Sequence, residues 1–382
     1  KLFMKKLFLI SLLVCVGILQ SFAFDYTDER GVTWGWKEFD NTSAQITSAF
    51  GYGDEVVIPE KVYNGTKEYT VTSISFTFQD NKNLEKVTWP SMVTTIPEYM
   101  FQNCSNLKAV ENTSNVTDIR NYAFSDCNNL IELDLGSCEI GEYAFNGCSK
   151  LQSIGETAKC TSVGWQAFSQ CSSLENIDLS MCTYVRYGAF SGCSKLQNVN
   201  ISNCTYIEGS AFSGCSSITE VDLSACKSLE GYAFSGCKKL ANVIGLENFI
   251  SIPEGAFRET ALKTINLPVC TTIGSYAFYG CSSITEVDLS ACKSLGNFAF
   301  SECKKLANVI GLENFISIPD YAFYGTNIKS VDLPVCTTIG SHAFSACSGL
   351  QSVDLPVCTT IGGGAFSACS GLQSVDLPVC TT

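Results

Sequence analysis

Cysteine is the residue type whose number and spacing in this sequence could carry chemistry. The 382 residues include 22 cysteines, and three of them near the C-terminal end, Cys358, Cys369 and Cys380, are spaced eleven residues apart. A regular series of thiols could ligate a metal, form disulfides or supply a nucleophile. However, no C-x-x-C pair occurs and His342 is the only histidine, so zinc binding and Cys-His catalysis lack their usual partners. We therefore expect no catalytic residue, no metal site and no cofactor.

Apart from Cys15, the cysteines fall into two columns, a column being the residues at one position of successive repeats. The first column follows a motif phenylalanine by three residues: Cys104, Cys127, Cys148, Cys171, Cys193, Cys215, Cys237, Cys281, Cys303, Cys347 and Cys369. The second column comprises Cys138, Cys160, Cys182, Cys204, Cys226, Cys270, Cys292, Cys336, Cys358 and Cys380. In the second column, Val93 and Val116 stand in early repeats, and Phe249 and Phe315 stand in later ones.

These substitutions indicate what the cysteines do. Valine and phenylalanine can replace a buried apolar residue, but they cannot replace a metal ligand or half of a disulfide. Disulfides are the alternative if the chain is secreted, because secretion usually exposes cysteines to an oxidising compartment. Stacked repeats would hold the Cβ vectors of neighbouring cysteines parallel, which opposes the short Cβ contact of a disulfide. We interpret the thiols as core residues and place Cys358, Ile361, Phe366 and Cys369 in the core of the last repeat.

Acidic residues form a further column inside a short Val-Asp-Leu motif, in which Leu133 and Ile177 replace the valine in two early coils. Its aspartates are Asp134, Asp178, Asp222, Asp288, Asp332, Asp354 and Asp376. Because strand side chains alternate and the flanking apolar residues point inward, the carboxylates should lie on the concave face of a sheet, about 4.8 Å apart in adjacent repeats. One interpretation is a solvated acidic surface that prevents aggregation. The other is a binding face for a basic partner segment or for calcium.

An aromatic column stands two residues before the motif phenylalanine. Its members include Tyr99, Tyr122, Tyr143, Tyr232, Tyr276, Phe298 and Tyr321, and His342 occupies the same position. Stacked aromatic rings could grip sugar rings or the side chains of a partner, which makes Tyr232, Tyr276 and Tyr321 candidate binding residues. Packing between adjacent turns is the alternative and the one we favour.

The elements that position these columns follow from one period. The motif phenylalanines are Phe101, Phe124, Phe145, Phe168, Phe190, Phe212, Phe234, Phe257, Phe278, Phe300, Phe323, Phe344 and Phe366, always 21 to 23 residues apart. A short strand and a return path in 22 residues make one coil, which buries its apolar side chains only when a neighbour stacks on it. We predict an α/β-type solenoid, a leucine-rich repeat with one short parallel β-strand per coil, mostly β and irregular return segments, and about 13 to 14 coils.

The repeat pattern LxxVDLPxCxxIxxxAFxxCxxL resembles that of the BspA-like leucine-rich repeats. Segments such as IGSYAFYGCSSI (Ile273–Ile284) and IGSHAFSACSGL (Ile339–Leu350) fit closely, and the resemblance extends from Val71 to Thr382. The sequence departs from the family pattern where cysteine replaces the usual valine or leucine, and where serine replaces proline at Ser180, Ser224 and Ser290. The resemblance implies a secreted or surface-displayed bacterial protein, and several members of this family act as adhesins for host matrix proteins or neighbouring cells.

Two blocks of the solenoid are nearly identical. The segment from Cys215 to Gly280 reappears, with few changes, from Cys281 to Ala346, so three coils are copied together. An enzyme site could not be lengthened in this way without disturbance, whereas a rod that binds through its area or its reach can be.

Three segments make up the predicted domain organisation. Residues 1–23 are predicted to be a signal peptide, with two lysines, an apolar run from Leu7 to Leu19 and a cleavage site after Ala23. Residues 24–70 are predicted to form an N-terminal β-rich cap, in which Asn64-Gly65 indicates a hairpin. Residues 71–382 are predicted to form the solenoid, and we expect its C-terminal portion to be incomplete because no second cap follows Thr382.

Charge and composition limit the function. The formal net charge of −13 disfavours nucleic acid as a partner, and no later stretch is apolar enough to span a membrane in the mature chain. We predict a secreted or cell-surface protein that binds a protein or glycan, such as host matrix or another cell surface, without catalysis. The alternative is a targeting or spacer arm of a larger secreted protein, for example a hydrolase whose other domain lies beyond Thr382.

Overall fold

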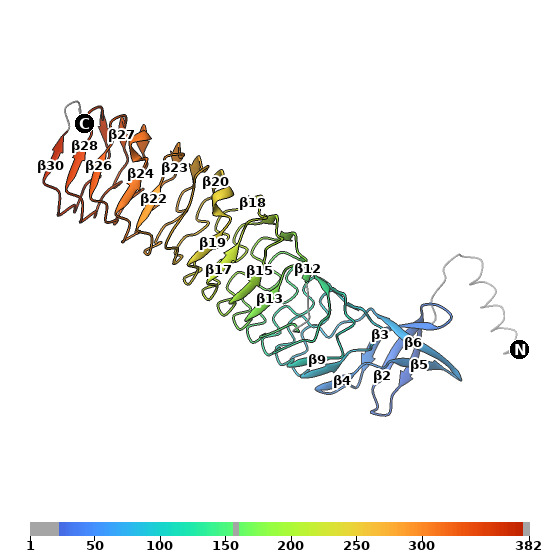
Figure 1. Ribbon diagram of the computed structural model, residues 1–382. Helices are drawn as coiled ribbons and strands as arrows, with labels where there is room; N and C mark the ends of the chain where they lie inside the picture. The colour runs from blue at the N-terminus through green and yellow to red at the C-terminus, as the bar shows by residue number, and fades with distance from the viewer. Residues whose placement is uncertain (1–22, 156–159, 377–382) are drawn as a thin grey trace, which may run out of the picture.

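The computed structural model describes residues 23–155 and 160–376, which form a long rod of stacked coils (Figure 1). A small sheet lies at the N-terminal end, and the coils run from it to the other end of the rod. Within the described ranges, no helix has the length and apolar character needed to cross a membrane. The predicted signal peptide lies outside the described residues except for Ala23.

The N-terminal sheet has five strands in the order β1-β2-β3-β6-β5. They are β1 (Ala23–Thr27), β2 (Thr33–Glu38), β3 (Ser43–Phe50), β5 (Lys61–Asn64) and β6 (Lys67–Ile74). Trp34 and Trp36 are completely buried in this sheet. Strands β5 and β6 form the predicted hairpin, with Asn64 opposite Lys67, so that Gly65 and Thr66 make the turn. That this sheet caps the solenoid stays a prediction.

One row of parallel strands follows the Val-Asp-Leu motif along the rod. It contains β4 (Glu55–Val57), β7 (Lys86–Thr88), β9 (Ala109–Glu111), β13 (Asn176–Asp178), β15 (Asn198–Asn200), β17 (Glu220–Asp222), β19 (Asn242–Ile244), β22 (Glu286–Asp288), β24 (Asn308–Ile310), β26 (Ser330–Asp332), β28 (Ser352–Asp354) and β30 (Ser374–Asp376). The pairing is parallel and in register, with Val331 opposite Val353. Strand β4, which lies inside the segment 24–70, already pairs with β7.

A second row of shorter parallel strands runs along the other side of the rod (Figure 1). It contains β8 (Thr95–Ile96), β10 (Asp118–Ile119), β11 (Cys138–Ile140), β12 (Cys160–Val163), β14 (Tyr184–Val185), β16 (Tyr206–Ile207), β18 (Ser228–Leu229), β20 (Ser251–Ile252), β21 (Thr272–Ile273), β23 (Ser294–Leu295), β25 (Ser317–Ile318), β27 (Thr338–Ile339) and β29 (Thr360–Ile361). The predicted solenoid is confirmed, and this row adds a second strand to most coils. Most of these strands have only two residues, which is too short to show alternation in a sequence.

Two coils contain the only regular helical turns among the described residues. These single-turn 3₁₀ helices are η1 (Leu246–Asn248) and η2 (Leu312–Asn314), and they occupy equivalent places in the two copied blocks. Each helical turn begins after a glycine with positive φ, Gly245 at 85° and Gly311 at 82°. A left-handed residue of this kind is readily supplied only by glycine, so the sequence fixes where the connection bends.

The core is organised around the phenylalanine column. Each ring from Phe78 to Phe366 stacks face to face on the next, with centroids 5.1 Å apart for Phe124 and Phe145 and 5.9 Å apart for Phe234 and Phe257. From Phe124 onward the residue before each of these phenylalanines is a small alanine, and Ala211, for example, is also completely buried. One ring per coil therefore produces a continuous aromatic stack through the rod.

Candidate functional site

The first-column thiols complete the hydrogen bonding of the core. The Cys215 Sγ donates to the backbone carbonyl of Phe190, one coil earlier, at 3.1 Å, and Cys237 donates in the same way to Phe212 at 3.2 Å. The same bond is made by every first-column cysteine. A buried carbonyl that lacks a second partner loses part of its hydrogen bonding, which explains why a thiol is used rather than a purely apolar side chain.

No disulfide joins any two of the described cysteines, and all of them except Cys369 are buried. Loss of solvation on burial raises the pKa of Cys104 to about 12 and holds the pKa of Cys127 well above its ordinary value. Neutral, buried thiols are poor nucleophiles and poor metal ligands. Within the described part of the chain, no group of three or more histidine, cysteine, aspartate or glutamate side chains could hold a metal ion.

Alkylation measures the state of these thiols. Protein purified without reductant and then denatured is expected to react with iodoacetamide at most of the 20 described cysteines, because no disulfide joins any two of them. The native protein should react far more slowly, since burial limits access to the thiols and a raised pKa keeps the thiolate fraction low at most of them, although a hydrogen bond with Cys160 lowers the pKa of Cys138. Mass spectrometry of intact protein counts the modified sites. A mass showing that most cysteines resist alkylation in denaturant until reductant is added would refute the interpretation as free thiols.

The strand face is the surface formed by the first and third residues of each strand in the first row. In β17 the central Val221 is buried, while Glu220 is exposed and Asp222 is half-buried. The third residues carry the predicted aspartates, but the column is not continuous. Ile244 and Ile310 stand opposite Asp222 and Asp288, and Gly155 interrupts the row after Asp134.

Three of the aspartates are used to build turns. Asp178, Asp222 and Asp288 each accept a hydrogen bond at 2.8 Å from the backbone N–H of the serine two residues later. Hydrogen bonds from the hydroxyl and the N–H of that serine lower the pKa of Asp222, and the pKa of Asp288 is lowered in the same way. These carboxylates are therefore partly committed to the chain itself.

The last aspartates differ because proline replaces the serine. Pro334 and Pro356 have no N–H, so they cannot donate to Asp332 and Asp354. Both aspartates are exposed, and in the described residues neither carboxylate forms an ion pair. The register places Asp332 beside Asp354 and Asp354 beside Asp376. We call the strand positions of Asp332, Asp354 and Asp376 the acidic patch.

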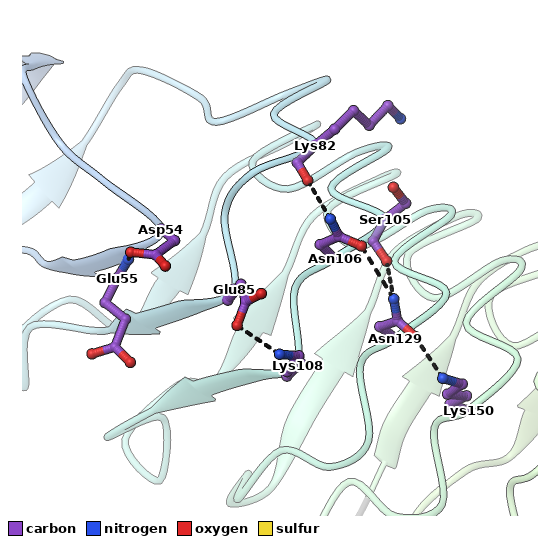
Figure 2. Close-up of polar contacts among 9 residues, drawn as sticks. All are labelled: Asp54, Glu55, Lys82, Glu85, Ser105, Asn106, Lys108, Asn129 and Lys150. Atoms are coloured by element: carbon purple, nitrogen blue, oxygen red, sulfur yellow. Dashed lines mark hydrogen bonds and ion pairs between the residues drawn. The ribbon is translucent and has the colours of Figure 1, made fainter.

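At the N-terminal end, the strand face carries compensating lysines instead. Lys86 forms an ion pair with Glu111 at 2.8 Å across neighbouring coils, and Lys108 forms one with Glu85 at 2.6 Å (Figure 2). Uncompensated negative charge in adjacent register positions is therefore a property of the C-terminal end of the strand face.

Polar side chains also link the neighbouring turns at this end of the rod, as Figure 2 shows. The Asn106 amide donates to the Lys82 carbonyl at 2.7 Å, and the Asn129 amide donates to the Ser105 carbonyl at 2.8 Å. The Lys150 ammonium then donates to the Asn129 side-chain oxygen at 2.7 Å. These side chains bond to the turns of adjacent coils, which makes this surface part of the scaffold.

The aromatic column consists of rings that stack on one another. Tyr276 stacks on Phe298 at 4.7 Å, Phe298 on Tyr321 at 4.5 Å and Tyr321 on His342 at 4.8 Å. The faces of these rings are thus covered by neighbouring coils, which is the packing interpretation. Tyr232 stands apart from this run, and its hydroxyl donates to Glu254 at 2.6 Å.

The residues predicted for the core of the last repeat are placed at the described end of the stack. Cys358 is completely buried, and Phe366 stacks on Phe344 at 5.6 Å. Ile361, Phe366 and Cys369 are only partly buried but pack against the core. No described coil covers their outer side.

Sequence reasoning found the aspartate column but missed its division into two groups. The signal was the residue two positions later, which is serine in one group and proline in the other, while Asp134, followed by Gly136, belongs to neither group. It also missed the second strand row and the places where that row is interrupted. Ile252-Pro253 and Ile318-Pro319 stand at these interruptions in the sequence.

Parallel strands stacked at a period near 22 residues, around a column of buried apolar rings, define a leucine-rich repeat solenoid. The model of the BspA type leucine rich repeat region matches this chain in six copies, over residues 71–184, 136–241, 171–285 and 271–382. The chain therefore belongs to the BspA-type leucine-rich repeat family. Leucine-rich repeat proteins bind other proteins in general, which is consistent with an extended exposed face.

Two solved structures share this architecture. A leucine-rich repeat protein from Bacteroides ovatus ATCC 8483 is 26% identical, with a TM-score of 0.64, covering 93% of this chain and 89% of that one. A leucine rich cell surface protein from Faecalibacterium prausnitzii A2-165 is 24% identical, with a TM-score of 0.57, covering 92% of this chain and 94% of that one. No curated protein matches the sequence.

Proposed function

We propose that this protein is a non-catalytic binding protein that attaches to a basic segment of another protein through the C-terminal part of its strand face. The observation that carries the proposal is the acidic patch, in which the exposed carboxylates of Asp332 and Asp354 lie in register with no hydrogen-bonding serine and no ion pair in the described residues, and the strand position of Asp376 continues the row. Like charges on adjacent strands repel, so a positively charged partner relieves an unfavourable arrangement in the free protein.

The surroundings of the acidic patch suit a protein partner. Val335 and Val357 follow the patch aspartates by three residues and are 47% and 42% exposed. Apolar side chains next to charges allow a partner to gain burial as well as electrostatic attraction. A matrix protein or a protein on another cell surface is the class of partner that we propose.

The absence of catalysis and the location outside the cell are parts of the same proposal. The imidazole of His342 stacks on Tyr321, and the thiols are engaged in the core, so neither is presented as a catalytic group. The predicted signal peptide and the family resemblance support secretion or display at the cell surface.

The test replaces the charges while keeping the shape. The triple variant Asp332→Asn, Asp354→Asn and Asp376→Asn is expected to bind a panel of purified matrix proteins about tenfold more weakly at low salt, because each exposed charge contributes up to about 1 kcal/mol. Binding of the parent should weaken as salt is added, while binding of the variant should change less. Surface plasmon resonance gives both affinities.

The matched control is the double variant Asp222→Asn and Asp288→Asn, in which asparagine can keep the hydrogen bond from the serine. Its binding should fall less than that of the triple variant. Equal binding by the triple variant and the parent would count against the proposal. Calcium tests the cation alternative, since a rise in Tm in the parent and not in the triple variant would favour a bound ion over a basic partner.

A further inference from the structure

The second strand row is interrupted twice in the C-terminal half of the rod. One sheet ends at β18 and the next begins at β20, and another break separates β23 from β25. Each terminal strand therefore has a hydrogen-bonded neighbour on one side only. Both strands that begin a new sheet, β20 and β25, are followed directly by proline, Pro253 and Pro319.

Proline explains the loss of pairing. In regular coils the residue after the strand donates its N–H to the preceding coil, as Glu230 does to the Ile207 carbonyl at 3.0 Å and Gly274 to the Ile252 carbonyl at 2.8 Å. Pro253 has no N–H to donate to the corresponding carbonyl of Leu229. The same applies to Pro319 and Leu295 at the second break.

Another coil of the chain separates the effect of proline from the effect of a longer connection. In the coils of β12 and β20, the connection that leads from the first strand row to the second is one residue longer than in the preceding coil. In the β12 coil this connection runs from Ile154 to Cys160. In the β12 coil, Gly164 stands where proline stands in the other, and its N–H donates to the Ile140 carbonyl at 2.8 Å. Strand β12 remains paired with β11 through a register shift. A longer connection alone is therefore tolerated.

Each break opens a groove in the surface. The groove between β18 and β20 has a volume of about 800 Å³, and the groove between β23 and β25 has a volume of about 490 Å³. Lys227 is the single charged residue that lines the first groove, and Lys293 is the single one that lines the second. Ile250 and Ile316, also in the lining, are 66% and 68% exposed.

The groups that line the two grooves indicate which kind of ligand would bind there. An open strand edge offers backbone N–H and C=O groups, and an extended peptide is the ligand that satisfies both. The exposed isoleucine gives an apolar contact. Lys227 and Lys293 have no ion-pair partner in the part of the chain that the structure describes, so each can take a carboxylate.

We infer that the two grooves are twin docking sites for extended, acidic peptide segments, which add as strands to the open edges of β18 and β23. The grooves are copies of one another because they lie in the two repeated blocks, three coils apart, or about 15 Å at the usual strand spacing. A partner that carries two such segments would therefore bind bivalently. These sites lie on the second strand row and take an acidic partner, so they are independent of the acidic patch.

A third break supplies an internal control. Strand β8 also begins a sheet and is followed by Pro97, but the groove beside it is lined by both Glu98 and Arg120. Opposite charges in one groove do not select an acidic peptide. The Pro97→Gly variant thus makes the same chemical change outside the proposed sites.

The experiment pans a phage-displayed library of random dodecapeptides on the full chain and counter-selects on the double variant Pro253→Gly and Pro319→Gly. The glycines restore the missing N–H, as in the β12 coil, and should close the grooves. Enriched peptides are expected to contain acidic and β-branched residues and to bind the parent about tenfold more tightly than the double variant. Pro97→Gly should bind them as the parent does.

Two further measurements separate backbone pairing from other kinds of binding. Synthetic peptides with alternate N-methylated residues should lose about tenfold in affinity, because they cannot pair along one edge. The double variant Lys227→Met and Lys293→Met should lose about threefold to tenfold, and its binding should become insensitive to salt. Circular dichroism and the Tm of each variant report whether it is folded.

Several results would overturn the inference. One is panning that yields no peptide able to distinguish the parent from a folded Pro253→Gly and Pro319→Gly variant. Another is full binding by the N-methylated peptides. A glycan array that shows binding lost in the glycine variant, without any discriminating peptide, would assign the grooves to glycans instead.

Discussion

Raising the pH from 8 to 10 is expected to unfold the rod steeply under reducing conditions. Loss of solvation on burial raises the pKa of Cys104, Cys182 and Cys204 to about 12, against an ordinary value of 9.0. Unfolded chains therefore release protons from about pH 9, while the native chain retains them. The stability that these thiols contribute is complete below pH 9 and is lost as the pH rises toward 12.

The size of the effect comes from the number of thiols. Each thiol that titrates only in the unfolded chain lowers the free energy of unfolding by about 1.4 kcal/mol per pH unit above pH 9. With many buried thiols in one rod, the midpoint of urea unfolding should fall sharply between pH 8 and 10. Urea titrations at several pH values, with a return to pH 8 to show reversibility, measure this shift.

Valine at second-column positions provides the control, because Val93 and Val116 occupy that column naturally. The double variant Cys182→Val and Cys204→Val should remain folded and should show a pH dependence smaller by about 3 kcal/mol per pH unit. A urea midpoint in the parent that does not change between pH 8 and 10 would show that the thiols are oxidised or exposed.

The substitution Phe212→Ala is expected to lower the free energy of unfolding by about 3–5 kcal/mol, as for other buried phenylalanines. Its ring is completely buried and stacks at 5.3 Å on both Phe190 and Phe234. Removal leaves a cavity in the middle of the aromatic stack, which coils on either side cannot easily close. Urea unfolding followed by circular dichroism gives the change in stability.

The same substitution at the described end of the stack is the matched control. Phe366 is only partly buried and stacks on one described ring, that of Phe344, so Phe366→Ala should cost clearly less than Phe212→Ala. If the two substitutions cost the same, the aromatic stack would not be the main source of cohesion between coils.

The solenoid could be predicted because one residue type, phenylalanine, recurs at the period of the coil. A phenylalanine every 21 to 23 residues must stack on its equivalent in the next coil if each coil is one turn, and the rings do stack. The second strand row could not be predicted in the same way. Strands such as Tyr206–Ile207 have two residues, and their pairing depends on a residue 22 positions away and not on local alternation.

The residues of the candidate site could be predicted from the sequence, but whether their carboxylates are hydrogen-bonded could not. The Val-Asp-Leu motif correctly indicated strands with outward-facing aspartates at Asp222 and Asp332. Whether such a carboxylate is engaged depends on a hydrogen bond to the next turn, which forms at Ser224 and cannot form at Pro334. Serine was recognised as a departure from the family pattern, but its effect on charge appears only with the turn geometry.

The interruptions of the second strand row could not be predicted from the residues of one coil alone. Proline at position 253 is ordinary for a turn, and only its place in the stack makes it disruptive. The lost bond would have joined it to Leu229, in the previous coil, and the groove needs the side chains of both coils. The groove therefore depends on which residues of neighbouring coils lie opposite each other.

Zero-length cross-linking tests most directly the claim that the protein binds through the acidic patch. A carbodiimide joins activated carboxylates to lysine amines of a matrix protein from the panel only where the two are in contact. Mass spectrometry should then locate cross-links at Asp332 and Asp354, with few at Asp222 or Asp288. Cross-links that avoid the strand face and concentrate on the N-terminal sheet would contradict the proposed binding mode.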